Sequence, residues 1–235
     1  DGVWQLKQTG YISPDQIIEP ARTICFAWKW LGEETVHFAA EWKGGHTKMV
    51  EKAWDVMDEA DYIVGWNSRS FDVKHLRTEF ITQHISPPSP HKDIDLMVVA
   101  KRNFGFMSNR LSYVAQRLGA GSKLANGGQH LWRTLRYGKG QELKDAKAMM
   151  EAYNIQDVVL TEEVYQIMLP WVDNLNIPIY NEVDVPACSN CGSYSIQYRG
   201  VQVAVTRSYR RFQCQECGKW GREVKSESSV VSIGV

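Results

Sequence analysis

Four cysteines near the C-terminal end have a spacing that predicts a specific chemistry. They form two Cys-x-x-Cys pairs, Cys188/Cys191 and Cys214/Cys217. Two such pairs supply four thiolates, the set with which proteins surround one Zn²⁺ ion tetrahedrally. Gly192 and Gly218 directly follow the pairs, and glycine suits the sharp turn that points backbone amides at the sulfurs. We therefore predict one structural Zn²⁺ bound by these four cysteines.

Two disulfides in a secreted domain are the alternative for the same spacing. The remaining sequence favours zinc, because it has the composition of a cytosolic α/β protein with a single further cysteine, Cys25. Cys25 lies in an apolar segment and is expected to act as a small buried hydrophobic residue. Reduced thiols and the lack of an export signal predict a cytoplasmic location, and no apolar run predicts a membrane span.

The charge distribution sets the cysteine-bearing region apart from the rest. The chain has 235 residues, 43% of them hydrophobic, and a formal net charge of zero. Residues 188–225 nevertheless carry seven Lys or Arg and two Glu, so this stretch is +5 and the remainder is −5. A basic module beside an acidic body indicates nucleic-acid contact by the module and cation binding in the body. A merely solvated charged face is the alternative.

Aromatic residues alternate with the arginines of this basic region. Aromatic rings can stack on bases while arginines contact phosphates, so we expect a nucleic-acid surface. The arginines assigned to substrate binding are Arg207, Arg210 and Arg211. Two alternatives remain open: the rings can form the core of a small domain, and the region can bind another protein.

Hydrophobic periodicity predicts an α/β fold. Strands are expected at residues 23–30 and 35–40 as a hairpin, and at residues 62–66 and 91–96. Helices are expected at residues 47–60 and 72–84, between an Asn109 cap and Gly119, and from about residue 142 to 168. In the cysteine region, residues 193–198 and 209–212 are expected to form ribbon strands. These elements predict a mixed sheet with helices on its faces.

Two short polar motifs stand at element boundaries of this pattern. Asn67 and Phe71-Asp72 follow the strand at 62–66, so the Asp72 carboxylate would lie at a helix N-terminus. Tyr153 and Asp157 are four residues apart and share one helix face. Taken alone, Asp72 is more often a helix cap and the Tyr/Asp pair a surface hydrogen bond. The order in which these motifs follow the predicted hairpin, helix and strands favours a functional site over these alternatives.

With these motifs, residues 23–170 resemble the DnaQ-like (DEDD) 3′–5′ exonucleases of the ribonuclease H-like superfamily. Asn67, Phe71 and Asp72 match the second exonuclease motif. Tyr153 and Asp157 match the third motif in its tyrosine-bearing (DEDDy) form. The resemblance implies a metal-dependent enzyme that releases nucleoside 5′-monophosphates from a 3′ end of DNA or RNA.

The resemblance also implies roles for these residues. Asp72 and Asp157 would bind two Mg²⁺ or Mn²⁺ ions, and Tyr153 would orient the attacking water. Asn67 and Phe71 would position the terminal nucleotide. The family's first motif, Asp-x-Glu, supplies two more metal-binding acids and the central strand of the sheet, and no Asp-x-Glu occurs in the 235 residues. We expect the sequence to begin just downstream of that motif; the alternative is a non-catalytic nucleic-acid-binding member of the family.

The expected domain organisation has three parts. Residues 1–180 would form the ribonuclease H-like exonuclease domain, and residues 181–225 a zinc ribbon that helps to hold nucleic acid. Residues 226–235 show no structural signal and would form a mobile tail.

Overall fold

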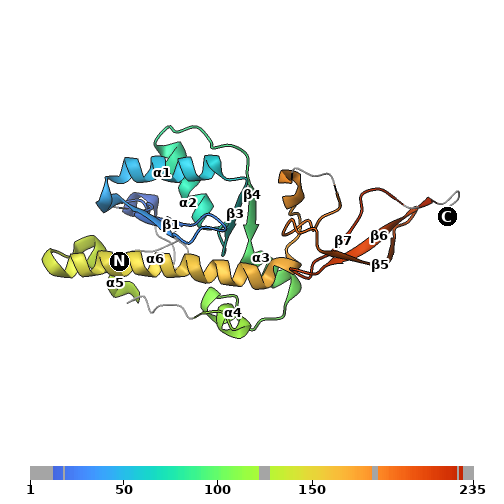
Figure 1. Ribbon diagram of the computed structural model, residues 1–235. Helices are drawn as coiled ribbons and strands as arrows, with labels where there is room; N and C mark the ends of the chain where they lie inside the picture. The colour runs from blue at the N-terminus through green and yellow to red at the C-terminus, as the bar shows by residue number, and fades with distance from the viewer. Residues whose placement is uncertain (1–12, 18, 122–127, 182–184, 227, 230–235) are drawn as a thin grey trace. The chain divides into compact units, whose positions relative to one another are not determined.

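The computed structural model describes residues 13–17, 19–121, 128–181, 185–226 and 228–229 (Figure 1). These residues form two compact units, the first from residues 1–93 and 124–159, the second from residues 94–123 and 160–235. Within the described parts of the chain, no helix has the length and apolar character needed to cross a membrane. Of the expected mobile tail, residues 227 and 230–235 lie outside the described residues.

The first unit combines short strands with longer helices. Its elements are β1 (Cys25–Trp28), β2 (His37–Ala40), α1 (His46–Glu59), β3 (Tyr62–Gly65), α2 (Asp72–Thr82) and α5 (Gly128–Tyr137), with the short 3-10 helices η1 (Pro14–Gln16) and η2 (Glu41–Lys43). Two further elements, β4 (Lys92–Asp95) and α6 (Gly140–Met168), have residues in both units.

The strands pair in twos. β1 and β2 form the expected antiparallel hairpin, with Cys25 opposite Ala40 and Trp28 opposite His37. β3 pairs with β4. The expected single mixed sheet is therefore seen, among the described residues, as two two-stranded sheets.

Two helices supply the core that packs against these strands. α1 contributes Met49, Val50, Ala53 and Met57, which share one face of the helix, and all four are buried. Val73 and Phe80 of α2 join the same cluster, against which residues of β1, β2 and β3 pack. Amphipathic helices of this kind are stable because the strands cover their apolar faces. The helices predicted for residues 47–60 and 72–84 are thus confirmed.

The long helix α6 has its own apolar cluster with α5. Leu131 of α5 and Ala146 and Met150 of α6 are buried together, with Cys25 and Tyr153 packed against them. α6 ends before Pro170, as predicted. α5 was not predicted, because it is short and follows a glycine-rich segment that favours a loop.

The second unit holds two short helices and the cysteine-bearing ribbon. Its elements are α3 (Leu96–Asn103), α4 (Leu111–Leu118), η3 (Leu169–Trp171), η4 (Ile177–Tyr180), β5 (Ile196–Val203), β6 (Arg207–Cys214), β7 (Trp220–Arg222) and β8 (Ser228–Ser229). β5, β6 and β7 are neighbours in one antiparallel sheet, and β8 pairs with β6. Part of the expected tail, β8, is therefore a strand.

Two sequence predictions in this unit need correction. The strand expected to reach residue 96 ends at Asp95, whose carboxylate accepts a hydrogen bond of 3.0 Å from the backbone N–H of Met97 and so caps α3. The predicted cap at Asn109 is wrong, since Arg110 occupies the N-cap position of α4 and no side chain caps it. The C-terminal end at Gly119, in the left-handed conformation with φ 72°, is as predicted.

A buried carboxylate on α2 connects three parts of the first unit. Glu79 is buried and accepts a hydrogen bond of 2.6 Å from the backbone N–H of Thr23, just before β1. Its other oxygen lies 3.0 Å from Nε2 of His46, the first residue of α1. One side chain thus fixes α2 relative to the hairpin and to α1.

Replacing this carboxylate tests its structural role. We expect Glu79→Ala to lower the free energy of unfolding by about 1–3 kcal/mol, because a partly buried N–H group and a partly buried imidazole lose their acceptor. Urea unfolding monitored by circular dichroism measures this. Glu51→Ala, at an exposed position of α1, is the control and should change stability by less than about 0.5 kcal/mol. Equal effects of the two substitutions would contradict the assignment.

Candidate functional site

The turn between β3 and α2 places the Asp72 carboxylate. Asn67 adopts a left-handed conformation with φ 61°, and its carbonyl accepts hydrogen bonds from the N–H groups of Ser70 and Phe71. The Ser68 carbonyl then accepts a bond of 2.9 Å from Val73 N–H. This compact turn makes Asp72 the first residue of α2. A carboxylate is favoured there by the exposed N–H groups of the first turn.

Phe71 presents an aromatic ring beside this carboxylate. Its side chain is 38% exposed, and its ring lies edge-on to that of His75, with centroids 4.6 Å apart. An aromatic ring held against a neighbouring side chain can pack against a nucleobase at little cost in conformational entropy.

Tyr153 and Asp157 lie in α6, one turn apart on one face. Both side chains are half-buried, and Tyr153 packs against the cluster of Leu131 and Met150. Together with Asp72 they belong to the first unit. The proximity of the Asp72 and Asp157 carboxylates stays a prediction.

The two Cys-x-x-Cys loops share one backbone design. In each loop the carbonyl of the first cysteine accepts a hydrogen bond from the glycine N–H that follows the second, at 2.9 Å for Gly192 and 3.1 Å for Gly218. Both glycines have positive φ angles, 74° and 79°, which explains why the sequence needs glycine there. The N–H of Cys188 and that of Cys214 each bond the carbonyl five residues onward.

These loops bring the four sulfurs together. The Cys188–Cys217 and Cys191–Cys214 sulfur pairs are 3.5 and 3.6 Å apart, and all four sulfurs lie within 4.8 Å of one another. No disulfide joins them. Tetrahedral coordination at about 2.3 Å requires sulfurs roughly 3.8 Å apart, so this cluster can hold one metal ion. Among the described residues it is the only group of three or more His, Cys, Asp or Glu side chains close enough to do so.

Burial and nearby N–H groups shift the pKa values of these thiols. Burial raises the pKa of Cys191 to about 11, and burial also raises the pKa of Cys217. Burial acts in the same direction on Cys214, but N–H groups of Cys217 and Glu216 point at its sulfur and lower its pKa below the ordinary value. Since a metal binds thiolates, binding to this cluster releases protons.

Residues of the cysteine loops and next to them also form hydrogen bonds with the segment that follows α6. Asn190, inside the first loop, is buried, and its amide donates hydrogen bonds of 2.6 and 2.8 Å to the carbonyls of Leu169 and Val172. Lys219, just after the second loop, donates to the Val172 carbonyl at 2.8 Å and to Asp173 at 3.1 Å. Sequence reasoning missed both residues, because their partners lie 18 to 47 positions away.

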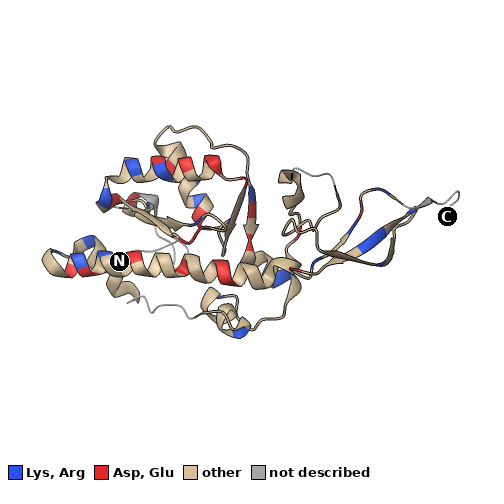
Figure 2. Cartoon of the chain, viewed as in Figure 1, with Lys and Arg blue, Asp and Glu red and all other residues tan. Residues whose placement is uncertain are grey.

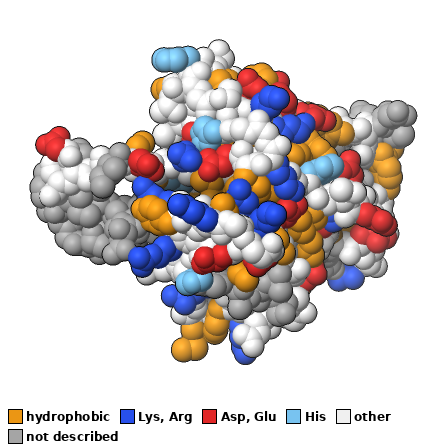
Figure 3. Space-filling model, turned by 90° about the vertical axis from the view of Figure 1, so that its left-hand side faces the viewer, with side chains coloured by type: hydrophobic (Ala, Val, Ile, Leu, Met, Phe, Trp, Pro, Cys, Tyr) orange, Lys and Arg blue, Asp and Glu red, His pale blue; other side chains and the backbone are white. Residues whose placement is uncertain are grey.

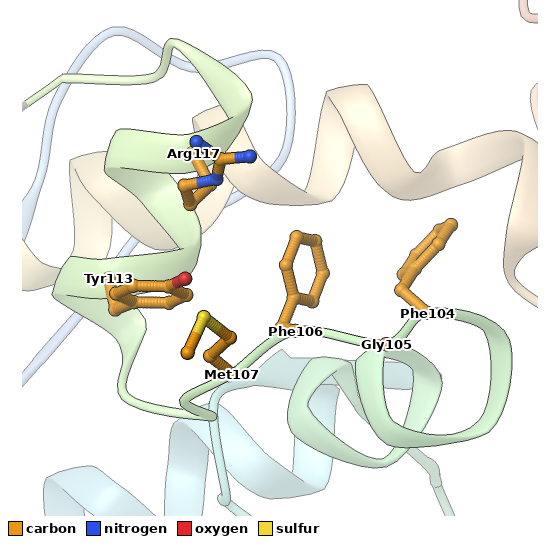
Figure 4. A pocket seen from close by; sticks show the side chains of 6 residues that line it. All are labelled: Phe104, Gly105, Phe106, Met107, Tyr113 and Arg117. Atoms are coloured by element: carbon orange, nitrogen blue, oxygen red, sulfur yellow. The ribbon is translucent and has the colours of Figure 1, made fainter.

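A cavity of about 450 Å³ lies elsewhere in the second unit (Figure 4). Three aromatic residues, one methionine, one glycine and one arginine line it: Phe104, Phe106, Tyr113, Met107, Gly105 and Arg117. None of the predicted catalytic or metal-binding residues lines it.

Comparison with known families decides the fold assignment. The family model described as RNase_H superfamily matches residues 20–169. This stretch contains Asn67, Phe71, Asp72, Tyr153 and Asp157. The chain belongs to the RNase_H superfamily. No curated protein matches the chain.

Membership of the RNase_H superfamily suggests a nuclease-type function on a nucleic-acid substrate. The fold is compatible with nuclease activity, and nucleases of this superfamily generally use divalent metal ions. The ribonuclease H-like fold expected from the sequence is thus confirmed at the level of the superfamily. The cysteine cluster lies outside the matched residues.

The ribbon of this RNase_H-superfamily protein has an excess of basic over acidic residues, seven against two in residues 188–225. Figure 2 shows Lys and Arg along the ribbon strands. On the face drawn in Figure 3, by contrast, basic and acidic side chains are interspersed. The predicted substrate-binding residues Arg207, Arg210 and Arg211 all lie in β6.

The fifth cysteine offers a test of burial in the first unit. Burial, with Glu41 and Glu151 nearby, raises the pKa of the Cys25 thiol to about 12. Only on the order of one such thiol in ten thousand is ionised at pH 8, and the thiolate is the reactive form. We expect iodoacetamide to label Cys25 at least about a hundredfold more slowly in the native protein than in urea.

The pH dependence of the labelling rate tests the direction of the pKa shift of Cys25. The labelling rate of native Cys25 should keep rising through pH 10, whereas in urea it should level off near pH 9, measured by peptide mass spectrometry. Equal rates in the native and unfolded protein at pH 8 would contradict this account.

Proposed function

We propose that this protein is a metal-dependent 3′–5′ exonuclease of the DEDDy type with a structural zinc ribbon. The observation that carries the proposal is the position of Asp72, the first residue of a helix that directly follows a strand and a compact turn. Tyr153 and Asp157 follow on α6 in the order that the exonuclease motifs require. All three lie inside the residues that match the RNase_H superfamily.

The side chains suit hard divalent cations. Asp72 and Asp157 offer carboxylate oxygens, the ligands that Mg²⁺ and Mn²⁺ prefer. When bound, two such ions supply an activated water and stabilise the leaving 3′ oxygen. The Tyr153 hydroxyl would orient that water, while Phe71 packs against the terminal base and Asn67 helps to position the terminal nucleotide.

Two further carboxylates complete such a site in the family. The resemblance assigns them to an Asp-x-Glu strand, which the 235 residues do not contain. A form of the protein that carries such a strand would offer all four acids of the family's site.

The cysteine cluster is proposed to bind Zn²⁺. Four thiolates at tetrahedral spacing select zinc among common cellular ions, because soft ligands and a closed four-coordinate geometry suit it. The ion would be structural, since the four sulfurs fill its coordination shell and leave no open position for chemistry.

A non-catalytic nucleic-acid-binding protein is the second candidate function. The +5 charge of residues 188–225 favours it. In that case the ribonuclease H-like fold would serve as a platform and the ribbon would carry recognition.

Cleavage of a labelled strand separates the two functions. The 235-residue chain should show at most trace activity on a 5′-labelled oligonucleotide with Mg²⁺ or Mn²⁺, because two of four acids are absent. A longer form carrying an Asp-x-Glu strand should shorten the oligonucleotide from its 3′ end. Asp72→Asn or Asp157→Asn in that form should reduce the rate by at least about a hundredfold.

Asp145→Asn is the matched control, because Asp145 is an exposed carboxylate on the same helix as Asp157. It should leave the rate within twofold or so of the unmodified form. Robust digestion by the 235-residue chain, abolished by EDTA, would show that other residues complete the site. No digestion by the longer form would favour the non-catalytic candidate.

Metal analysis tests the zinc proposal. We expect one Zn²⁺ per chain, lost in Cys214→Ser and retained in the control Cys25→Ser. Removing the ion should unfold the ribbon, because a module of this size has too little core without it. Trypsin should then cut at the β6 arginines while the first unit stays intact. Full trypsin resistance of the metal-free ribbon would contradict a structural role.

A further inference from the structure

The strand register divides the ribbon's side chains between two faces. In antiparallel pairs, opposite residues project to the same side and neighbours along a strand alternate. Arg211 lies opposite Arg222, and Gln213 lies opposite Trp220. We call the side that these residues share the basic–aromatic face; it carries Arg199, Arg207, Tyr209, Arg211, Trp220 and Arg222.

The opposite face holds the ribbon's interior. Phe212 and Cys214 on this side are buried. Arg210 projects to this side as well, and its guanidinium lies 3.6 Å from the centroid of the Tyr198 ring. Glu223 accepts a hydrogen bond from the Tyr198 hydroxyl, which raises the pKa of Tyr198, and it lies 3.7 Å from Arg210. Arg210 is thus part of a structural group with Tyr198 and Glu223.

On the basic–aromatic face, arginines and rings are arranged together. The Arg222 guanidinium lies 3.9 Å from the centroid of the Tyr209 ring. Those of Arg211 and Arg199 lie 4.8 and 6.0 Å from the Trp220 ring. A guanidinium that contacts a ring through its own face keeps N–H donors at its edges, where phosphate oxygens can reach them.

The charge and the exposure of the basic–aromatic face indicate which kind of ligand fits it. Four arginines lie on the basic–aromatic face, while Glu223 contacts Tyr198 and Arg210 on the other side. The Trp220 side chain is 45% exposed. β6, with eight residues, extends about 26 Å, enough for several phosphates of an extended strand. An exposed ring can stack only on a base that is not already stacked on both sides in a duplex. A single strand therefore fits this face better than a double strand.

We propose that the basic–aromatic face binds single-stranded nucleic acid, with phosphates on Arg199, Arg211 and Arg222 and a base on Trp220, whereas Arg210 stabilises the ribbon from the opposite face. The proposal rests on the function proposed above, in which the ribbon holds nucleic acid. It assigns different roles to the adjacent residues Arg210 and Arg211, and for Arg210 it replaces the sequence-based expectation of substrate binding by a structural role.

Equilibrium binding without Mg²⁺ or Mn²⁺ tests this surface independently of cleavage. The probes are fluorescein-labelled dT20 and rU20, followed by fluorescence anisotropy over a salt series. Trp220→Ala should weaken binding of at least one probe by about fivefold or more. Arg211→Gln and Arg222→Gln should each also weaken it, and the two together should reduce the salt slope of log K by about 1.4, two single-strand phosphates.

Arg210→Gln is the matched control, since it removes the same charge from the next position of the same strand. It should leave the affinity and the salt slope unchanged while lowering the melting temperature of the ribbon. Zinc content and circular dichroism verify that each variant is folded.

Three outcomes would overturn the proposal. If Arg210→Gln weakens binding as much as Arg211→Gln does, the attraction is an unspecific effect of net charge. If the variants of the basic–aromatic face bind both probes as tightly as the unmodified protein, a protein partner would be favoured. A duplex of the same length could bind more tightly than dT20 and rU20. Each result leaves the catalytic assignment of Asp72 and Asp157 unaffected, because that is tested by cleavage.

Discussion

The sulfur cluster is the constraint on which the ribbon depends. Among the described residues from 185 onward, the buried side chains are Cys188, Asn190, Phe212 and Cys214. Phe212 alone cannot supply a core, so the cysteines must do so, and a bound metal would convert two buried and two half-buried thiols into one closed centre. The same loops carry Asn190 and Lys219, whose hydrogen bonds hold the segment after α6. Metal binding and docking of the ribbon therefore share one set of loops.

In the first unit, backbone hydrogen bonds fix the position of the Asp72 carboxylate at the start of α2. In the turn after β3 the backbone carbonyls of Asn67 and Ser68 accept hydrogen bonds from backbone N–H groups, so the position of Asp72 does not depend on a side-chain cap. Farther along α2, Glu79 bonds Thr23 N–H and lies beside His46. A helix fixed at its buried face by such contacts keeps its first turn in a constant position. This is what a metal-binding carboxylate requires.

Charge in this protein is organised by strand geometry. The ribbon carries +5 in residues 188–225, but the register places Arg210 with Tyr198 and Glu223 and places its neighbour Arg211 with Trp220. Net charge alone would treat these arginines as equivalent. The pairing of β6 with β5 and β7 makes them different, because it places Arg210 on the side of the buried Phe212 and Cys214 and Arg211 on the opposite side.

The sequence by itself determined the features that depend on local spacing. The cysteine loops, the hairpin, the helices α1, α2 and α6 and the left-handed end of α4 at Gly119 all follow from residues close in the chain. Only the tertiary structure showed the helix that Asp95 caps, the helix α5, the contacts of Asn190 and Lys219, and the face on which each arginine lies. Their causes are a side-chain cap that overrides strand propensity, hydrogen bonds to distant carbonyls, and a strand register that the order of the residues does not specify.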